Sequence, residues 1–149
     1  MTGAHLHHEL WIERGGEFFA VNERLAVGKN LQDPTVQDEL IKDAKKTAII
    51  MNAKDNFLPE GRAERLHEEI NDLTNLGLQP EELDLRAFFG KADDLQEYAK
   101  QFDYFWVTGG NAFLLRRAFR QSGFDHIISK LLKEDRVAYG GFSAGIAVL

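Results

Sequence analysis

Three short runs of hydrophobic residues constrain the fold of this chain more than any other feature. They occupy residues 48–51, 104–107 and 137–139. Each run is too short for a helix and is typical of a strand that is buried on both faces. Longer stretches with apolar residues at helical spacing lie around them. Because such strands alternate with helices, the sequence predicts an α/β fold of three layers, with helices on both faces of a mainly parallel sheet.

The remaining elements are predicted from weaker patterns. We expect helices near residues 63–76, 92–101, 112–121 and 124–132. A short strand is expected at residues 82–85. Residues 18–27 predict either a hairpin or one strand with a turn, and residues 35–44 predict a short helix. The chain is therefore divided into an atypical N-terminal segment, residues 1–46, and an α/β domain, residues 47–149.

The composition excludes several classes of protein. The chain has no cysteine, which excludes disulfide frameworks and thiol catalysis. A net charge of −6 argues against nucleic-acid binding, which requires a basic surface. No apolar run approaches the roughly 18–20 residues that a membrane helix needs, and His5, His7 and His8 are interpreted as solvated rather than as metal ligands. We therefore expect a cytoplasmic protein with no nucleic-acid or membrane partner, no cofactor and no metal.

One turn carries the pattern of nucleophilic catalysis. Residues 141–145, Gly-Phe-Ser-Ala-Gly, match the G-x-S-x-G nucleophile elbow and directly follow a predicted strand. Such an elbow exposes the serine hydroxyl, and small flanking residues prevent backbone clashes. Ser143 would be the nucleophile, and the N–H of Ala144 would face the developing oxyanion from a helix N-terminus. The alternative is a tight turn whose glycines only permit a helix to pack closely on a strand.

A second glycine-rich turn follows the strand at residues 104–107. Thr108, Gly109, Gly110 and Asn111 lie at the carboxyl end of that strand, where open α/β sheets place their sites. Backbone N–H groups of such a turn can face a ligand. Gly109, Gly110 and Asn111 are therefore candidates for oxyanion and substrate binding. The alternative is a structural turn in which Asn111 caps the next helix.

Together, the segments 107–115 and 140–145 resemble the peptidase S51 family. This family includes peptidase E, an alpha-aspartyl dipeptidase, and cyanophycinase, on a flavodoxin-like fold similar to that of class I glutamine amidotransferases. The resemblance extends over about residues 47–149. It implies a serine-type peptidase that hydrolyses small peptides, among them aspartyl peptides. It also implies that Ser143 is the nucleophile and that Gly110, Asn111 and Ala144 line the region around the substrate carbonyl.

The chain departs from this family in two places. Residues 1–46 differ from the family's usual opening, and nothing after Ser143 matches the histidine that the family supplies as catalytic base. We expect His67 and His126 to lie on helix surfaces rather than beside Ser143. The chain is therefore expected to be truncated after the elbow, and a catalytically inactive α/β module that binds a small ligand or a protein is the alternative function. A third interpretation is a nucleotide-binding flavodoxin-like domain. The sequence gives no positive evidence for it, because neither of the glycine-rich phosphate-binding motifs GxGxxG and GxxxxGK(S/T) is present.

The predicted strand at residues 137–139 is the last one in the chain. A nucleophile strand normally has a neighbour on each side, so we expect one of its edges to be open. An open edge and exposed apolar residues favour association. We therefore expect a homo-oligomer in which residues 136–149 or residues 1–46 cover the surface. In the competing outcome, the N-terminal segment folds back on the same chain.

Overall fold

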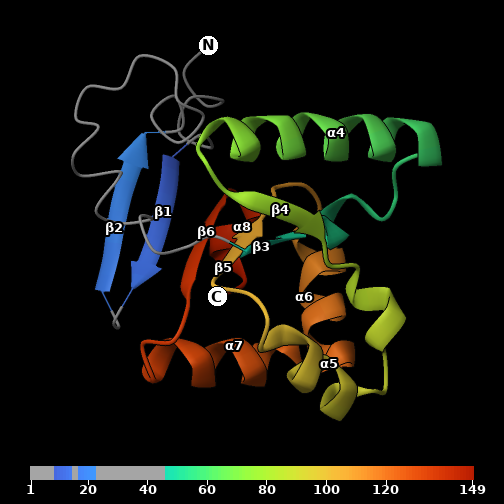
Figure 1. Cartoon of the computed structure of the whole chain (residues 1–149). Helices are drawn as coiled ribbons and strands as arrows, with labels where there is room; N and C mark the ends of the chain where they lie inside the picture. Colours follow the sequence, from blue (N-terminus) through green and yellow to red (C-terminus); the bar gives the residue numbers. More distant parts are fainter. Residues whose placement is uncertain (1–8, 15–16, 23–45) are drawn as a thin grey trace.

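The computed structural model describes residues 46–149, and the backbone of residues 9–14 and 17–22. It contains a six-stranded sheet of order β2-β1-β6-β5-β3-β4 (Figure 1). The four parallel strands are β3 (Lys46–Ile50), β4 (Gln79–Glu82), β5 (Tyr104–Val107) and β6 (Ala138–Phe142). The hairpin strands β1 (Glu9–Arg14) and β2 (Glu17–Asn22) extend the sheet in antiparallel fashion.

The helices form one layer on each face of this sheet. The long helix α4 (Pro59–Asn75) covers one face, as Figure 1 shows. The other face is covered by α5 (Ala92–Ala99), α6 (Ala112–Ser122), α7 (Phe124–Lys133) and α8 (Ala144–Ala147). Two 3-10 turns, η1 (Asn52–Lys54) and η2 (Leu85–Phe88), follow β3 and β4. The three-layer α/β fold predicted from the sequence is confirmed.

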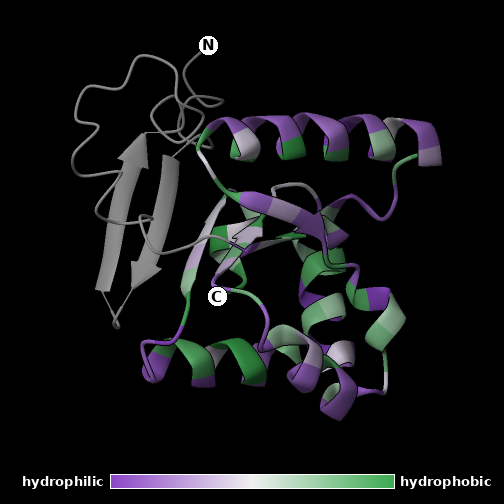
Figure 2. Cartoon of the chain, viewed as in Figure 1, coloured by the Kyte–Doolittle hydropathy of each residue, from purple (hydrophilic) through white to green (hydrophobic). Residues whose placement is uncertain are grey.

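Alternation along β5 divides the core into two clusters. Tyr104 and Trp106 face α4, whereas Phe105 and Val107 face the opposite helical layer. All four residues of this strand are buried, as expected for a strand covered on both faces. Figure 2 shows that α7 is more hydrophobic than α4, which is mostly hydrophilic. In the described part of the chain, no helix is both long enough and apolar enough to cross a membrane.

Three predicted strands have different bounds in the structure, and the strand expected at residues 48–51 is β3 at Lys46–Ile50. The strand expected at residues 82–85 is β4 at Gln79–Glu82, and η2 follows where the strand was expected to end. Pro80 is tolerated within β4 because β4 is an edge strand with no further neighbour in the described sheet. The last strand extends to Phe142, so that Gly140 and Gly141 belong to β6 rather than to the turn.

The N-terminal hairpin closes the edge of β6 that was expected to be open. β1 pairs with β6 in antiparallel register, with Leu10 opposite Phe142 and Glu13 opposite Tyr139. The expectation of an open edge at the nucleophile strand is therefore wrong, because a strand from early in the same chain takes the neighbouring position. The predicted helix at residues 35–44 lies outside the described residues.

Candidate active site

The turn from β6 to α8 has the geometry of a nucleophile elbow. Ser143 lies between the two elements with φ 52° and ψ −117°. A positive φ is uncommon for a residue with a side chain, and such strain is typical of functional sites. The Ser143 side chain is exposed to solvent. The structure thus presents its hydroxyl at the carboxyl edge of the parallel strands.

The backbone of β5 explains why small residues flank Ser143. A Cβ atom at Gly141 would lie 2.6 Å from the carbonyl oxygen of Val107. A Cβ atom at Gly145 would lie 2.9 Å from the carbonyl carbon of the same residue. The hydroxyl of Tyr139 donates a hydrogen bond to the Gly145 carbonyl oxygen, which ties α8 to β6. Glycine at positions 141 and 145 therefore lets both arms of the elbow pack against the end of β5.

The glycine-rich turn after β5 lies beside this elbow. A Cβ atom at Gly109 would lie 3.1 Å from the Cβ atom of Ser143 and 3.0 Å from the ring of Phe142. Gly110 has φ +146°, and a Cβ atom there would lie 2.5 Å from the carbonyl oxygen of Ala53. The two glycine-rich turns, residues 108–111 and 141–145, are thus adjacent at the same edge of the sheet.

Asn111 has a clear structural function. Its side-chain oxygen accepts hydrogen bonds from the N–H groups of Phe113 at 2.9 Å and Leu114 at 3.1 Å, and so caps α6. Its own N–H donates to the carbonyl oxygen of Ala53 at 2.7 Å. The Asn111 side-chain oxygen therefore acts as the helix cap that the alternative interpretation expected. The substrate-binding role assigned to Asn111 stays a prediction.

Two backbone N–H groups at this edge are available to a ligand. They belong to Gly110 and to Ala144, the first residue of α8. Within the described residues, neither group donates a hydrogen bond. The first N–H groups of a helix have no partner inside the helix and attract negative charge. Oxyanion binding by Gly110 and Ala144 stays a prediction that this arrangement permits.

Lys54 also lies at this edge, and the buried ring of Trp106 packs against Phe142, which precedes Ser143. The sequence pattern did not identify either residue as part of the site. The Nζ of Lys54 donates to the Oγ1 of Thr108 at 3.2 Å and to the carbonyl oxygen of Gly109. The indole N–H of Trp106 donates to the carboxylate of Glu69 at 2.8 Å. The sequence signal for Lys54 was its position just beyond the carboxyl end of a buried strand, where sites of α/β sheets lie.

A buried polar network supports the loop that contains Lys54. Asn52 is fully buried, and its amide donates to Asp55 at 2.9 Å and to Asp84 at 3.0 Å. Its oxygen accepts from the N–H of Leu85 at 3.1 Å. Burial by itself would raise the pKa of Asp84, but hydrogen bonds from Arg86 and Asn52 outweigh it and lower the pKa to about 2. The network thus joins η1 to the end of β4.

The histidines do not complete a catalytic centre in the described part of the chain. His67 lies on α4 and His126 on α7; both are exposed, and neither is hydrogen-bonded to Ser143. His5, His7 and His8 lie outside the described residues.

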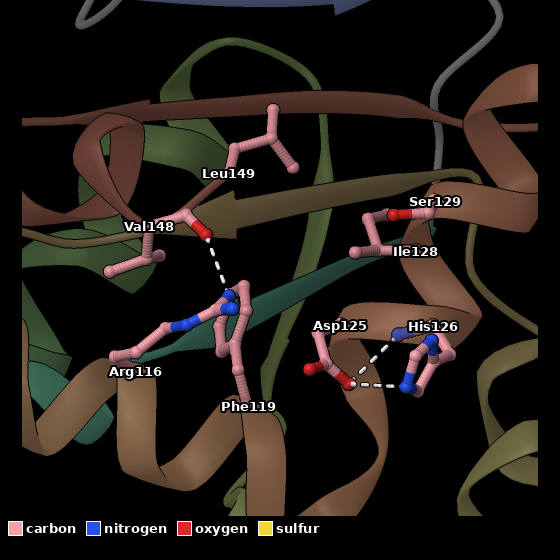
Figure 3. Close-up of a pocket in the computed structure, with 8 residues that line it drawn as sticks. All are labelled: Arg116, Phe119, Asp125, His126, Ile128, Ser129, Val148 and Leu149. Carbon is pink, nitrogen blue, oxygen red and sulfur yellow. Dashed lines mark hydrogen bonds and ion pairs between the residues drawn. The ribbon is translucent and has the colours of Figure 1, made fainter.

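A pocket of about 230 Å³ lies beside α6 and α7, and Figure 3 shows its lining. The lining residues are Arg116, Phe119, Asp125, His126, Ile128, Ser129, Val148 and Leu149. Arg116 crosses it to donate to the carbonyl oxygen of Val148 at 3.3 Å. Neither Ser143 nor Gly109 lines this pocket, so it is distinct from the candidate site.

Comparisons with known proteins agree with this geometry. The model of peptidase family S51 matches residues 29–149. A crystal structure of a candidate peptidase E from Listeria monocytogenes EGD-e is similar, with a TM-score of 0.58 and 25% sequence identity. The alignment covers 74% of this chain and 52% of that one, so this chain spans about half the length of that protein. No curated protein matches the chain. Because the family model covers most of its length, the chain belongs to peptidase family S51.

Proposed function

We propose that Ser143 is the nucleophile of a serine-type peptidase that hydrolyses small peptides in the cytoplasm, among them aspartyl dipeptides. The observation that carries this proposal is the positive φ of Ser143 at the β6–α8 turn, next to Gly109. Family membership and the likeness to a candidate peptidase E support peptidase activity, and the resemblance of residues 107–115 and 140–145 to the family suggests a small aspartyl peptide as substrate. The cytoplasmic location is supported by a sequence without cysteine.

The proposed reaction is acyl transfer through Ser143. Its Oγ attacks the carbonyl carbon of the substrate, and the π electrons of that bond move to the carbonyl oxygen. The N–H groups of Gly110 and Ala144 stabilise the resulting anion. A general base takes the hydroxyl proton and gives it to the amine that leaves, and water then releases the acyl group by the same route. The family resemblance assigns the role of base to a histidine.

Hydrolysis of aspartyl dipeptides by the 149-residue chain and its Ser143→Ala variant tests the activity. We expect turnover far below ordinary enzyme rates of ~1–10³ s⁻¹, because His67 and His126 are exposed and neither is hydrogen-bonded to Ser143. Loss of the base in a serine triad costs several orders of magnitude, although oxyanion donors alone retain about 10³–10⁴-fold over water. Ordinary turnover that Ser143→Ala abolishes would contradict the expected slow rate and would require a base among the histidines of this chain.

The alternative function is an inactive α/β module that binds a small ligand or a protein, and the exposed positions of His67 and His126 favour it. Covalent labelling by a fluorophosphonate, followed by intact-mass spectrometry, distinguishes the two. A nucleophilic Ser143 predicts one adduct in the wild type and in Ser129→Ala, which removes another exposed serine, and none in Ser143→Ala. Because neither His67 nor His126 is hydrogen-bonded to Ser143, the labelling is expected to be slow and is followed for hours with the reagent in excess. Measurable labelling that is equal in all three proteins would exclude Ser143 as the nucleophile and leave the binding module.

A further inference from the structure

The side chain of Lys54 connects η1 to the residues that surround Ser143. Its ammonium group donates to the Gly109 carbonyl oxygen and to the Oγ1 of Thr108 at 3.2 Å. The same nitrogen lies 5.8 Å from the centre of the Phe142 ring, the residue that precedes the nucleophile. Lys54 is half-buried at the carboxyl end of β3. A positive charge is therefore held against both glycine-rich turns of the site.

The hydrogen bond from Lys54 to the Gly109 carbonyl oxygen determines the direction of the Gly110 N–H group. All described peptide bonds are trans, and in a trans peptide the C=O of residue 109 and the N–H of residue 110 point in opposite directions. The peptide between two glycines rotates easily because neither residue has a Cβ atom. A charge-assisted hydrogen bond on the Gly109 oxygen therefore favours one of the two orientations of this peptide.

We propose that Lys54 is a positioning residue of the Ser143 site: its ammonium holds the Gly109 carbonyl and thereby keeps the Gly110 N–H directed away from η1 and free to bind an oxyanion. This inference rests on the function proposed for Ser143. If the Gly109–Gly110 peptide rotated, a carbonyl oxygen would replace the N–H donor and would repel the anion. Lys54 acts on the reaction through Gly110 and makes no contact with the reacting atoms.

The charges around Lys54 give this interaction a pH dependence. Burial lowers the pKa of the Lys54 ammonium below 10.5, and the positive charges of Arg65 and Arg62 act in the same direction. Glu69, also on α4, raises the pKa and so opposes them. The groups that face Lys54 from β5 and β6 are the uncharged Thr108, Gly109 and Phe142. Lys54 therefore releases its proton at a lower pH than an ordinary lysine, and the hold on Gly109 weakens as the pH rises.

Two measurements on the full chain test the proposal. The first is the rate at which a fluorophosphonate labels Ser143, and the second is the ¹H–¹⁵N resonance of the Gly110 amide. Lys54→Met removes the charge and the donors at similar length, Lys54→Arg keeps both, and Lys133→Met removes an exposed lysine on α7 as a matched control. We expect Lys54→Met to lower the labelling rate roughly 10- to 100-fold and to move the Gly110 resonance. Lys54→Arg and Lys133→Met should stay close to the wild type in both measurements.

The remaining outcomes separate this inference from the proposed function. An unchanged Gly110 resonance in folded Lys54→Met overturns the inference, whatever the labelling rate. Labelling of Lys54→Met at the wild-type rate also overturns it. If the wild type is labelled no faster than Ser143→Ala, the proposed function fails, and the Gly110 resonance alone decides whether Lys54 orients the peptide. If Lys54→Met does not fold, Lys54→Gln takes its place with the same expected results.

Discussion

Replacing Gly145 by alanine tests whether α8 must lie against β5 for the elbow to form. The new Cβ atom would lie 2.9 Å from the carbonyl carbon of Val107 and nearer still to its oxygen. Ordinary carbon–carbon contacts are ~3.5–4.0 Å long, so α8 has to move by roughly 0.6 Å or more. Overpacking of this kind costs about 1–3 kcal/mol, and alanine returns up to ~1 kcal/mol through its helix propensity. Because backbone atoms block the methyl group, we expect a net loss of about 2 kcal/mol.

Thermal unfolding followed by circular dichroism measures this loss. A change of about 2 kcal/mol corresponds to a Tm that is roughly 4–8 °C lower for a chain of this size. The matched control is Gly61→Ala in α4, where, apart from the adjacent residues and the backbone of the helix itself, no atom lies within 4 Å of the new methyl group. This control should keep the wild-type Tm or raise it slightly. Equal Tm values for Gly145→Ala and Gly61→Ala would refute the close approach of α8 to β5.

Three further predictions concern stability and association. Burial raises the pKa of Asp84, but hydrogen bonds from Arg86 and Asn52 outweigh it and lower this pKa from 3.8 to about 2. The stabilisation of the fold by ionised Asp84 is therefore complete above about pH 3.8 and is lost as the pH falls toward 2. Asp84→Asn should therefore reduce the free energy of unfolding at pH 7 by about 1 kcal/mol, a value discounted for solvent screening. The free energy of unfolding of the variant should also fall less steeply than that of the wild type as the pH is lowered. Urea unfolding at several pH values measures both effects, and an unchanged acid profile would contradict the assignment. Trp106→Phe removes the indole bond to Glu69 and should cost about 1 kcal/mol by the same assay, whereas full wild-type stability would argue against that bond. Finally, β2 is an edge strand of the described sheet, and we propose that copies of the chain associate through it. Light scattering at micromolar concentration should show a homodimer or larger species. A monomer near 16.9 kDa would exclude such association.

The amino-acid sequence by itself determined the layers of the fold. Residues 48–51 and 104–107 predicted buried strands because an uninterrupted apolar run of that length is typical of a strand with both faces covered by helices. The apolar stripe of α4 was visible for the same reason, since side-chain spacing along a helix is a local property. The two glycine-rich turns were also recognisable, because each directly follows a buried strand. Local patterns of this kind require no knowledge of the rest of the chain.

Only the tertiary structure decided which segments meet. The pairing of β1 with β6 joins residues more than a hundred positions apart, and no local spacing encodes such a partner. The strand bounds at β4 and β6 moved because hydrogen bonding to neighbouring strands, rather than hydropathy, determines where a strand ends. Lys54 looked like any polar residue after a strand, and its contact with Gly109 exists only because β3 and β5 are adjacent in the sheet. The closeness of Gly109 to Ser143 has the same origin, because β5 and β6 are parallel neighbours whose carboxyl ends lie at one edge.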